Sequence, residues 1–172
     1  MRVLNLPVAD LVMLAIAVSV GIPLIVADVR EHRLPNRLTG GAALALIAVA
    51  VVDGIAGPGR SRWLPMVLTA AGMAAAGYLL AVVSPSGVGL GDVKLLGVIG
   101  LALGHLNPQT LVVWLLALAL ASAAWLLLAS RFDRMADRSV PWRKRHIAFG
   151  PPMIVAWWLV YAAVVLAGAP PR

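Results

Sequence analysis

Six stretches of nearly uninterrupted apolar residues constrain this chain more than any other feature of its sequence. A transmembrane helix needs about 20 apolar residues, so six of them use roughly 120 residues. In a chain of 172 residues they leave only short connections and no room for a soluble domain. The sequence therefore predicts a single all-α transmembrane domain over residues 1–172, a bundle of six helices. The six stretches are residues 11–27, 38–52, 63–83, 93–106, 111–130 and 147–167.

The composition excludes soluble and disordered proteins. Hydrophobic residues make up 62% of the chain and charged residues 12%, whereas soluble domains average about 45–50% and about 25%. The absence of cysteine excludes disulfides, zinc–cysteine centres and thiol chemistry. His32, His105 and His146 fall in separate predicted loops, so we expect no metal site. No basic stripe carries aromatic residues, so we expect no nucleic-acid binding.

The basic residues predict the orientation of the bundle. If all six stretches cross the membrane, ten of the 14 Lys and Arg residues follow the first, third and fifth helices. Basic loops stay in the cytoplasm, so both termini are expected outside. The fourth stretch rises only about 21 Å, but this charge asymmetry favours its crossing. We expect Arg143, Lys144 and Arg145 to bind anionic membrane lipid, and most tryptophans to be interfacial anchors. Asp53 is expected in an outer loop, and Asp10 at an outer helix start, where the helix dipole favours a carboxylate.

Two acidic residues lie where a charge is costly. Asp28 follows the first apolar stretch and Asp92 begins the fourth, so both are expected at the cytoplasmic membrane boundary. An ionisable residue at that depth indicates function. Of two facing carboxylates, one keeps its proton and the other is charged, which is the arrangement of aspartic proteases. The alternative is that each carboxylate caps a helix or pairs with a nearby basic residue.

The residues around the two aspartates also have alternative roles. The glycine-rich residues 87–91 permit an extended loop that brings Asp92 against a substrate backbone, or they only break a helix. Lys94 either reaches the lipid head groups or tunes the aspartate pair. Asn36, which follows Pro35, is expected to cap a helix and to hold Asp28 in place.

Three separated segments resemble the type IV prepilin peptidases, which are membrane aspartic peptidases with a GxGD motif. Residues 28–36 are similar to the family's Asp, basic turn and Ile-Pro-Asn, with Leu34 in place of isoleucine. Residues 89–95 match GxGD followed by x-Lys-Leu. Residues 149–151 are similar to the Pro-Phe-Gly-Pro that begins the last helix, with Ala148 in place of the first proline.

This resemblance implies a membrane-embedded aspartic endopeptidase with Asp28 and Asp92 as its catalytic pair and no cofactor or metal. It would remove the short basic leader of prepilin or pseudopilin precursors, cutting after glycine at the cytoplasmic face of a bacterial or archaeal inner (plasma) membrane. Longer members carry a domain with zinc-binding cysteines that is associated with methyl transfer. This cysteine-free chain resembles the short form, so we expect peptidase activity alone. The implied active-site loop and support residues are Gly89, Gly91, Lys94, Pro35, Asn36, Gly150 and Pro151.

Two other functions fit parts of the same pattern. A protease that cuts inside transmembrane helices, in the manner of presenilin, shares the GxGD element, but this chain lacks the extra helices expected of it. A non-enzymatic membrane subunit or small transporter would use Asp28 and Asp92 to relay protons or bind a cation.

Overall fold

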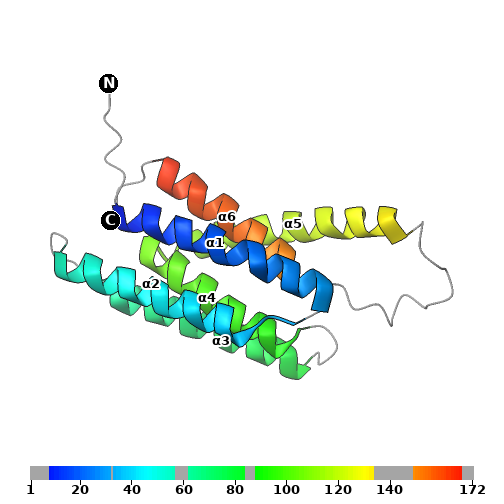
Figure 1. The fold of residues 1–172 in the computed structure, drawn as a ribbon, viewed down its shortest axis with the longest axis horizontal. Coiled ribbons are helices and arrows are strands. Elements are labelled where there is room, and N and C mark those ends of the chain that lie inside the picture. The colour runs from blue at the N-terminus through cyan, green and yellow to red at the C-terminus, as the bar shows by residue number, and fades with distance from the viewer. Residues whose placement is uncertain (1–7, 32, 57–61, 84–87, 134–148, 168–172) are drawn as a thin grey trace.

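The computed structural model describes residues 8–31, 33–56, 62–83, 88–133 and 149–167, and all regular structure in these ranges is helical. Successive helices run in opposite directions (Figure 1). The end of α1 therefore lies with the starts of α2 and α6, and the end of α3 with the start of α4, at what we call the aspartate end because Asp28 and Asp92 lie there; α5 projects beyond it (Figure 1). The all-α prediction is confirmed. The helices are α1 (Val8–Glu31), α2 (Asn36–Ala56), α3 (Trp63–Val83), α4 (Leu90–Leu106), α5 (Thr110–Asp133) and α6 (Gly150–Leu166).

Four helices, α1, α2, α3 and α5, are long and apolar enough to cross a membrane, by length and composition. α4 and α6 have 17 residues each, a rise of about 25 Å against a hydrocarbon core of about 30 Å. Their crossing, and the outward orientation of both termini, stay predictions.

The helices extend beyond the apolar stretches that predicted them. α1 continues to Glu31, so Asp28 lies within its last turn, and α4 begins at Leu90 rather than at residue 93. Polar residues continue a helix at its ends because the backbone hydrogen bonds do not depend on apolar side chains. The last helix begins at Gly150, and residues 147–148 lie outside the described ranges.

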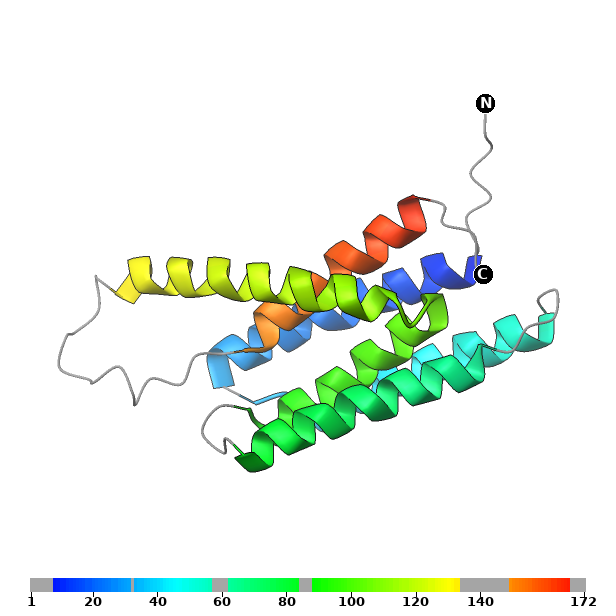
Figure 2. The same ribbon diagram turned by 180° about the vertical axis from the view of Figure 1, so that it is seen from behind.

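α4 is the central helix of the bundle, because it contacts α2, α3, α5 and α6. Figure 2 shows α3 on one side of α4 and α5 with α6 on the other. The contact with α3 is the most extensive, and glycine makes it possible. A Cβ added at Gly100 would lie 2.7 Å from the Cα of Ala70, and one added at Gly104 would lie 2.7 Å from the Cα of Met66. This Gly-x-x-x-Gly spacing lets the two backbones touch.

The expectation that the tryptophans are interfacial anchors is wrong for two of them. Trp157 is fully buried and Trp114 is almost fully buried, so both belong to the core of the bundle. Many large apolar residues on the outer faces of the helices are exposed, which suits contact with lipid. An indole therefore fills space between helices here, and the position of a tryptophan near a span end did not reveal this. Trp142 lies outside the described residues.

The end of the bundle away from the aspartate end holds a second polar cluster. His105 lies in the last turn of α4, not in a loop, and is buried with both ring nitrogens lacking a hydrogen bond. Its Nε2 lies 3.4 Å from Oδ1 of Asp10 and 3.8 Å from Oδ2 of Asp53. Arg62 Nη1 lies 3.7 Å from Asp10 Oδ1 and donates to the backbone oxygen of His105 at 3.3 Å.

The structure places Asp10 in the first turn of α1, as predicted, and corrects the expectation that Asp53 lies in an outer loop. Asp10 is 6% exposed, and Asp53 belongs to α2 rather than to a loop. A carboxylate in the first turn of a helix is favoured by the helix dipole, and the partners on other elements stabilise it further. The cluster therefore joins α1, α2 and α4 to the residue that precedes α3.

We predict that Arg62→Leu destabilises the protein by about 1–3 kcal/mol, because the buried carboxylate of Asp10 loses its cationic partner. For a chain of this size, that corresponds to a fall of several degrees in the unfolding temperature. The measurement is thermal unfolding in detergent, followed by tryptophan fluorescence. Arg37→Leu, which changes an exposed arginine at the start of α2, is the matched control. Equal unfolding temperatures for the two variants would contradict the prediction.

Candidate active site

Asp28 is positioned by the packing of α1 against α6. The indole of Trp158 donates from Nε1 to the backbone oxygen of Ala17 at 2.9 Å. A Cβ added at Gly21 would lie 2.5 Å from Cζ2 of Trp158 and 2.8 Å from Cγ2 of Ile154. The glycine therefore gives α6 room to lie close along α1. This packing brings the first residue of α6 to the last turn of α1, where Asp28 is 6% exposed.

The carboxylate of Asp28 caps α6. The backbone N–H of Gly150 donates to Oδ2 of Asp28 at 2.9 Å. The next two residues of α6 are Pro151 and Pro152, which have no N–H, so Gly150 supplies the only backbone donor among the first three residues. The positive end of the helix dipole also favours a carboxylate there. A Cβ added at Gly150 would lie 2.6 Å from the same oxygen, so the contact requires glycine.

Asp92 is the third residue of α4 and is fixed by the start of its own helix. Its Oδ2 accepts a hydrogen bond from the backbone N–H of Gly89 at 3.1 Å, as in a capping box. Gly89 has φ −83° and ψ 156°, so no left-handed conformation is needed there. Gly91 is already helical, and a Cβ added to it would lie 3.3 Å from the Cβ of Leu34. The glycine at position 91 therefore serves close packing, while Gly89 is extended and lies just before the helix.

The segment before α2 ties the two aspartate-bearing helices together. Leu34 is buried against Gly91, and the oxygen of Pro35 accepts from the backbone N–H groups of Leu38 and Thr39 at 3.0 and 3.2 Å. The Oδ1 of Asn36 accepts from Nζ of Lys94 at 2.7 Å, instead of capping its own helix as expected.

The hydrogen bond between Asn36 and Lys94 gives the lysine a partner that neither of its two predicted roles named. Lys94 joins α4 to the first residue of α2, at an exposed position beside the aspartates. It therefore helps to hold the start of α4, which carries Asp92, against the segment that follows α1.

The two carboxylates interact electrostatically across the space between α1 and α4. The charge of Asp28 repels that of Asp92. Asp28 is buried and Asp92 half-buried, so solvent screens this repulsion less than it does at an exposed surface. A negative charge on one of the two carboxylates therefore opposes a second charge on the other. Within the described ranges, no group of three or more His, Asp or Glu residues could hold a metal ion.

The structure brings the predicted site residues together at the aspartate end, on the last turn of α1 and around the starts of α2, α4 and α6 (Figure 1). The sequence does not reveal that Leu34 packs against Gly91 or that Trp158 bonds to α1, because these partners lie far away in the chain and no local pattern indicates them. His32, Gly87, His146 and residues 143–145 lie outside the described residues. The residues brought together are Asp28, Pro35, Asn36, Gly89, Gly91, Asp92, Lys94, Gly150 and Pro151.

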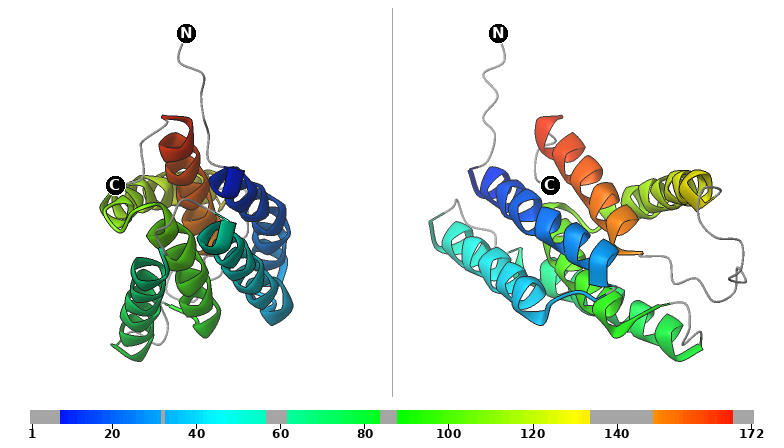
Figure 3. Two further views of the ribbon diagram at one scale, coloured as in Figure 1. Left: turned by 90° about the vertical axis from the view of Figure 1, so that its left-hand side faces the viewer. Right: turned by 45° about the vertical axis from the view of Figure 1, so that its right-hand side comes forward.

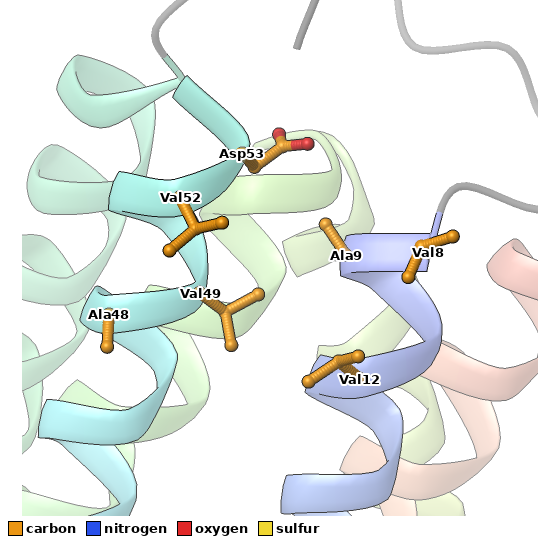
Figure 4. A pocket seen from close by; sticks show the side chains of 7 residues that line it. All are labelled: Val8, Ala9, Val12, Ala48, Val49, Val52 and Asp53. Carbon is orange, nitrogen blue, oxygen red and sulfur yellow. The ribbon is translucent and has the colours of Figure 1, made fainter. Parts of the chain in front are cut away.

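A groove of about 480 Å³ lies between α1 and α2 at the opposite end of the bundle. Figure 4 shows Val8 and Val12 of α1 across from Val49 and Val52 of α2, with Asp53 at the end of the groove. Its walls are otherwise apolar. The groove therefore lacks the paired carboxylates of the aspartate end.

The family model of the type IV leader peptidase family matches residues 14–129, about two thirds of the chain. The chain therefore belongs to this family, and it is a membrane protein built from apolar helices. The match includes Asp28 and Asp92 but ends before Gly150. Neither the curated proteins nor the solved structures include a match to this chain. Membership in a peptidase family implies a protein substrate.

We predict that Gly150→Ala lowers leader cleavage about 10–100-fold, because the added methyl group displaces the carboxylate of Asp28 and small displacements of reacting groups are costly. The rate is measured on a leader-bearing precursor, with the amount of folded protein checked by gel filtration. Gly41→Ala is the control, since an added Cβ meets nothing within 4 Å there. Full activity of Gly150→Ala would show that the contact does not position the site.

Proposed function

We propose that this protein is a membrane-embedded aspartic endopeptidase that removes the short basic leader from type IV prepilin-like precursors, cutting after glycine. One observation carries the proposal: in a chain of the leader peptidase family, Asp28 at the end of α1 and Asp92 at the start of α4 lie at the same end of the bundle (Figure 1). The sequence resemblance to the GxGD peptidases assigns the same two residues. The precursor class and the glycine at the cut come from that resemblance.

The proposed chemistry uses one proton shared between two carboxylates. The ionised aspartate takes a proton from water, and the resulting hydroxide forms a bond to the carbonyl carbon of the scissile peptide. The protonated aspartate donates its proton to the carbonyl oxygen, which gives a tetrahedral diol. The diol then returns a proton to the second carboxylate as the first protonates the leaving amine and the C–N bond breaks. Both aspartates end in their starting states.

The backbone contacts of the site explain why the two carboxylates can work at fixed positions. The N–H of Gly150 holds Asp28 and the N–H of Gly89 holds Asp92. These donors come from helix starts, which are rigid, so little reorganisation is needed during the reaction. A substrate backbone would lie between α1 and α4, with its carbonyl group facing both carboxylates.

The predicted orientation places this chemistry at the cytoplasmic face of the inner membrane. A basic leader would stay in the cytoplasm, while the hydrophobic helix that follows the cut would lie in the bilayer. Only residues 32–35 separate α1 from α2, which leaves no space there for a methyltransferase domain. We therefore expect the product to carry an unmethylated N-terminus, a difference that the mass of the mature chain reveals.

We predict that Asp28→Asn and Asp92→Asn each reduce cleavage of a co-expressed prepilin by about 10²–10⁴-fold, since each removes an acid–base group. Precursor length is measured by mass spectrometry after confirming that every variant reaches the membrane. Glu31→Gln, an exposed carboxylate three residues beyond Asp28, is the matched control and should keep full activity. Cleavage that survives either aspartate substitution would remove that residue from the mechanism. An uncleaved precursor with the parent protein would reject this substrate.

We also predict a bell-shaped dependence of kcat/KM on pH. The pair must hold a single proton, so activity falls at low pH, where both carboxylates are protonated, and at high pH, where both are ionised. The profile is measured with purified protein in detergent over a pH range in which the folded fraction is constant. A rate that rises steadily with pH would indicate a base without a partner acid and would contradict the shared proton.

A further inference from the structure

A groove of about 580 Å³ runs between α2 and α3, and α4 forms its floor. It exists because α2 and α3 each pack on α4 and make little contact with each other. Figure 3 shows α4 between them in the view along the bundle. The lining on α4 extends from Lys94 to Leu101, which is about 10 Å or two helical turns. The groove is therefore long enough to accept part of a second helix.

The walls of this groove are built from small residues. An added Cβ at Gly40 of α2 would meet nothing within 4 Å, and one at Gly97 of α4 would make only an ordinary contact of 3.7 Å with Ala74. The remaining wall residues on α3 include Ala70 and Ala71. Within a membrane, such walls allow the backbone of another helix to approach closely. The groove between α1 and α2 differs, because branched valines line it.

One end of the groove lies at the start of α4, the helix that carries Asp92. This polar end of the groove is formed by Asn36 and Lys94, which are joined by a hydrogen bond of 2.7 Å. Asp92 lies two residues before Lys94 on the same turn of α4, on a different side of the helix, so a chain that leaves the groove at this end must pass around the start of α4 to reach it. The other end, near Leu101 and Val67, is wholly apolar.

We propose that this groove docks the hydrophobic helix of the substrate precursor, directly after the bond that is cut. The inference rests on the proposed function, in which a hydrophobic helix follows the scissile bond. The start of that helix must lie within reach of Asp28 and Asp92, and the groove ends at Asn36 and Lys94, at the starts of the helices α2 and α4. A lipid acyl chain, the other candidate occupant, is flexible and does not require glycine and alanine walls.

The first test fills the groove. In Gly40→Leu the new side chain starts from a wall of the groove, whereas in Gly41→Leu it starts from a residue outside the groove lining; an added Cβ meets nothing within 4 Å at either position. We expect Gly40→Leu to raise KM for a full precursor about tenfold or more through overpacking, with no change for a short peptide that carries the leader and the cut but no helix. Gly41→Leu should match the parent on both substrates. Equal KM values for the two leucine variants on the precursor would overturn the proposal.

The second test detects the docked helix directly. The chain has no cysteine, so single cysteines can be introduced without background reaction. In an Asp92→Asn protein, which retains uncut precursor, Ala71→Cys should form a disulfide with a cysteine in the first turns of the precursor helix. Gly72→Cys lies outside the groove on the same helix and should not. Equal disulfide yields at both positions would show that the helix does not dock specifically in the groove. No disulfide at Ala71→Cys would show that the helix lies elsewhere and that lipid fills the groove. Either result rejects the proposal.

The two proposals fail in different ways. If the parent protein leaves the precursor uncut, the proposed function fails. If the parent cuts the precursor and Gly40→Leu cuts it equally well, only the docking groove fails.

Discussion

The backbone contact between α3 and α4 is the constraint on which the rest of the bundle depends. Gly100 and Gly104 let the two helices touch at the level of their Cα atoms, and this contact fixes the position of α4 along the bundle axis. Because α4 also contacts α2, α5 and α6, the positions of these helices depend on the position of α4. Asp92 at its start and His105 at its end are consequently placed by the same packing that forms the core.

Apolar stretches predicted the number and approximate position of the helices, because burial in lipid demands long runs of apolar residues whatever their partners are. The same reasoning failed for Asp53 and His105. Their neighbours along the chain suggested outer loops, but their environment is set by α2, α4 and the residue before α3, which come together only in the folded bundle. The sequence did hold one signal of this cluster: its four polar residues, Asp10, Asp53, Arg62 and His105, are all predicted on the same side of the membrane.

The candidate site shows a similar division. Its aspartates could be predicted from the cost of a charge at the membrane boundary, and its glycines and proline from a resemblance to a peptidase family. What each glycine does required the fold: Gly91 accommodates Leu34, and Gly150 accommodates the carboxylate of Asp28. Both are close approaches between segments distant in sequence. Spacing along the chain identifies such residues, whereas only the packing of helices gives their physical reason.

The central position of α4 also limits how this chain can change by insertion or deletion. One residue added between Asp92 and Gly100 would turn the carboxylate about 100° around the helix axis and shift it by about 1.5 Å, since Gly100 and Gly104 hold the other part of α4 against α3. The carboxylate would then face away from α1. The number of residues between the aspartate and the two glycines is thus as strict a requirement as the residues themselves. Selection is therefore expected to act against insertions and deletions in this part of α4.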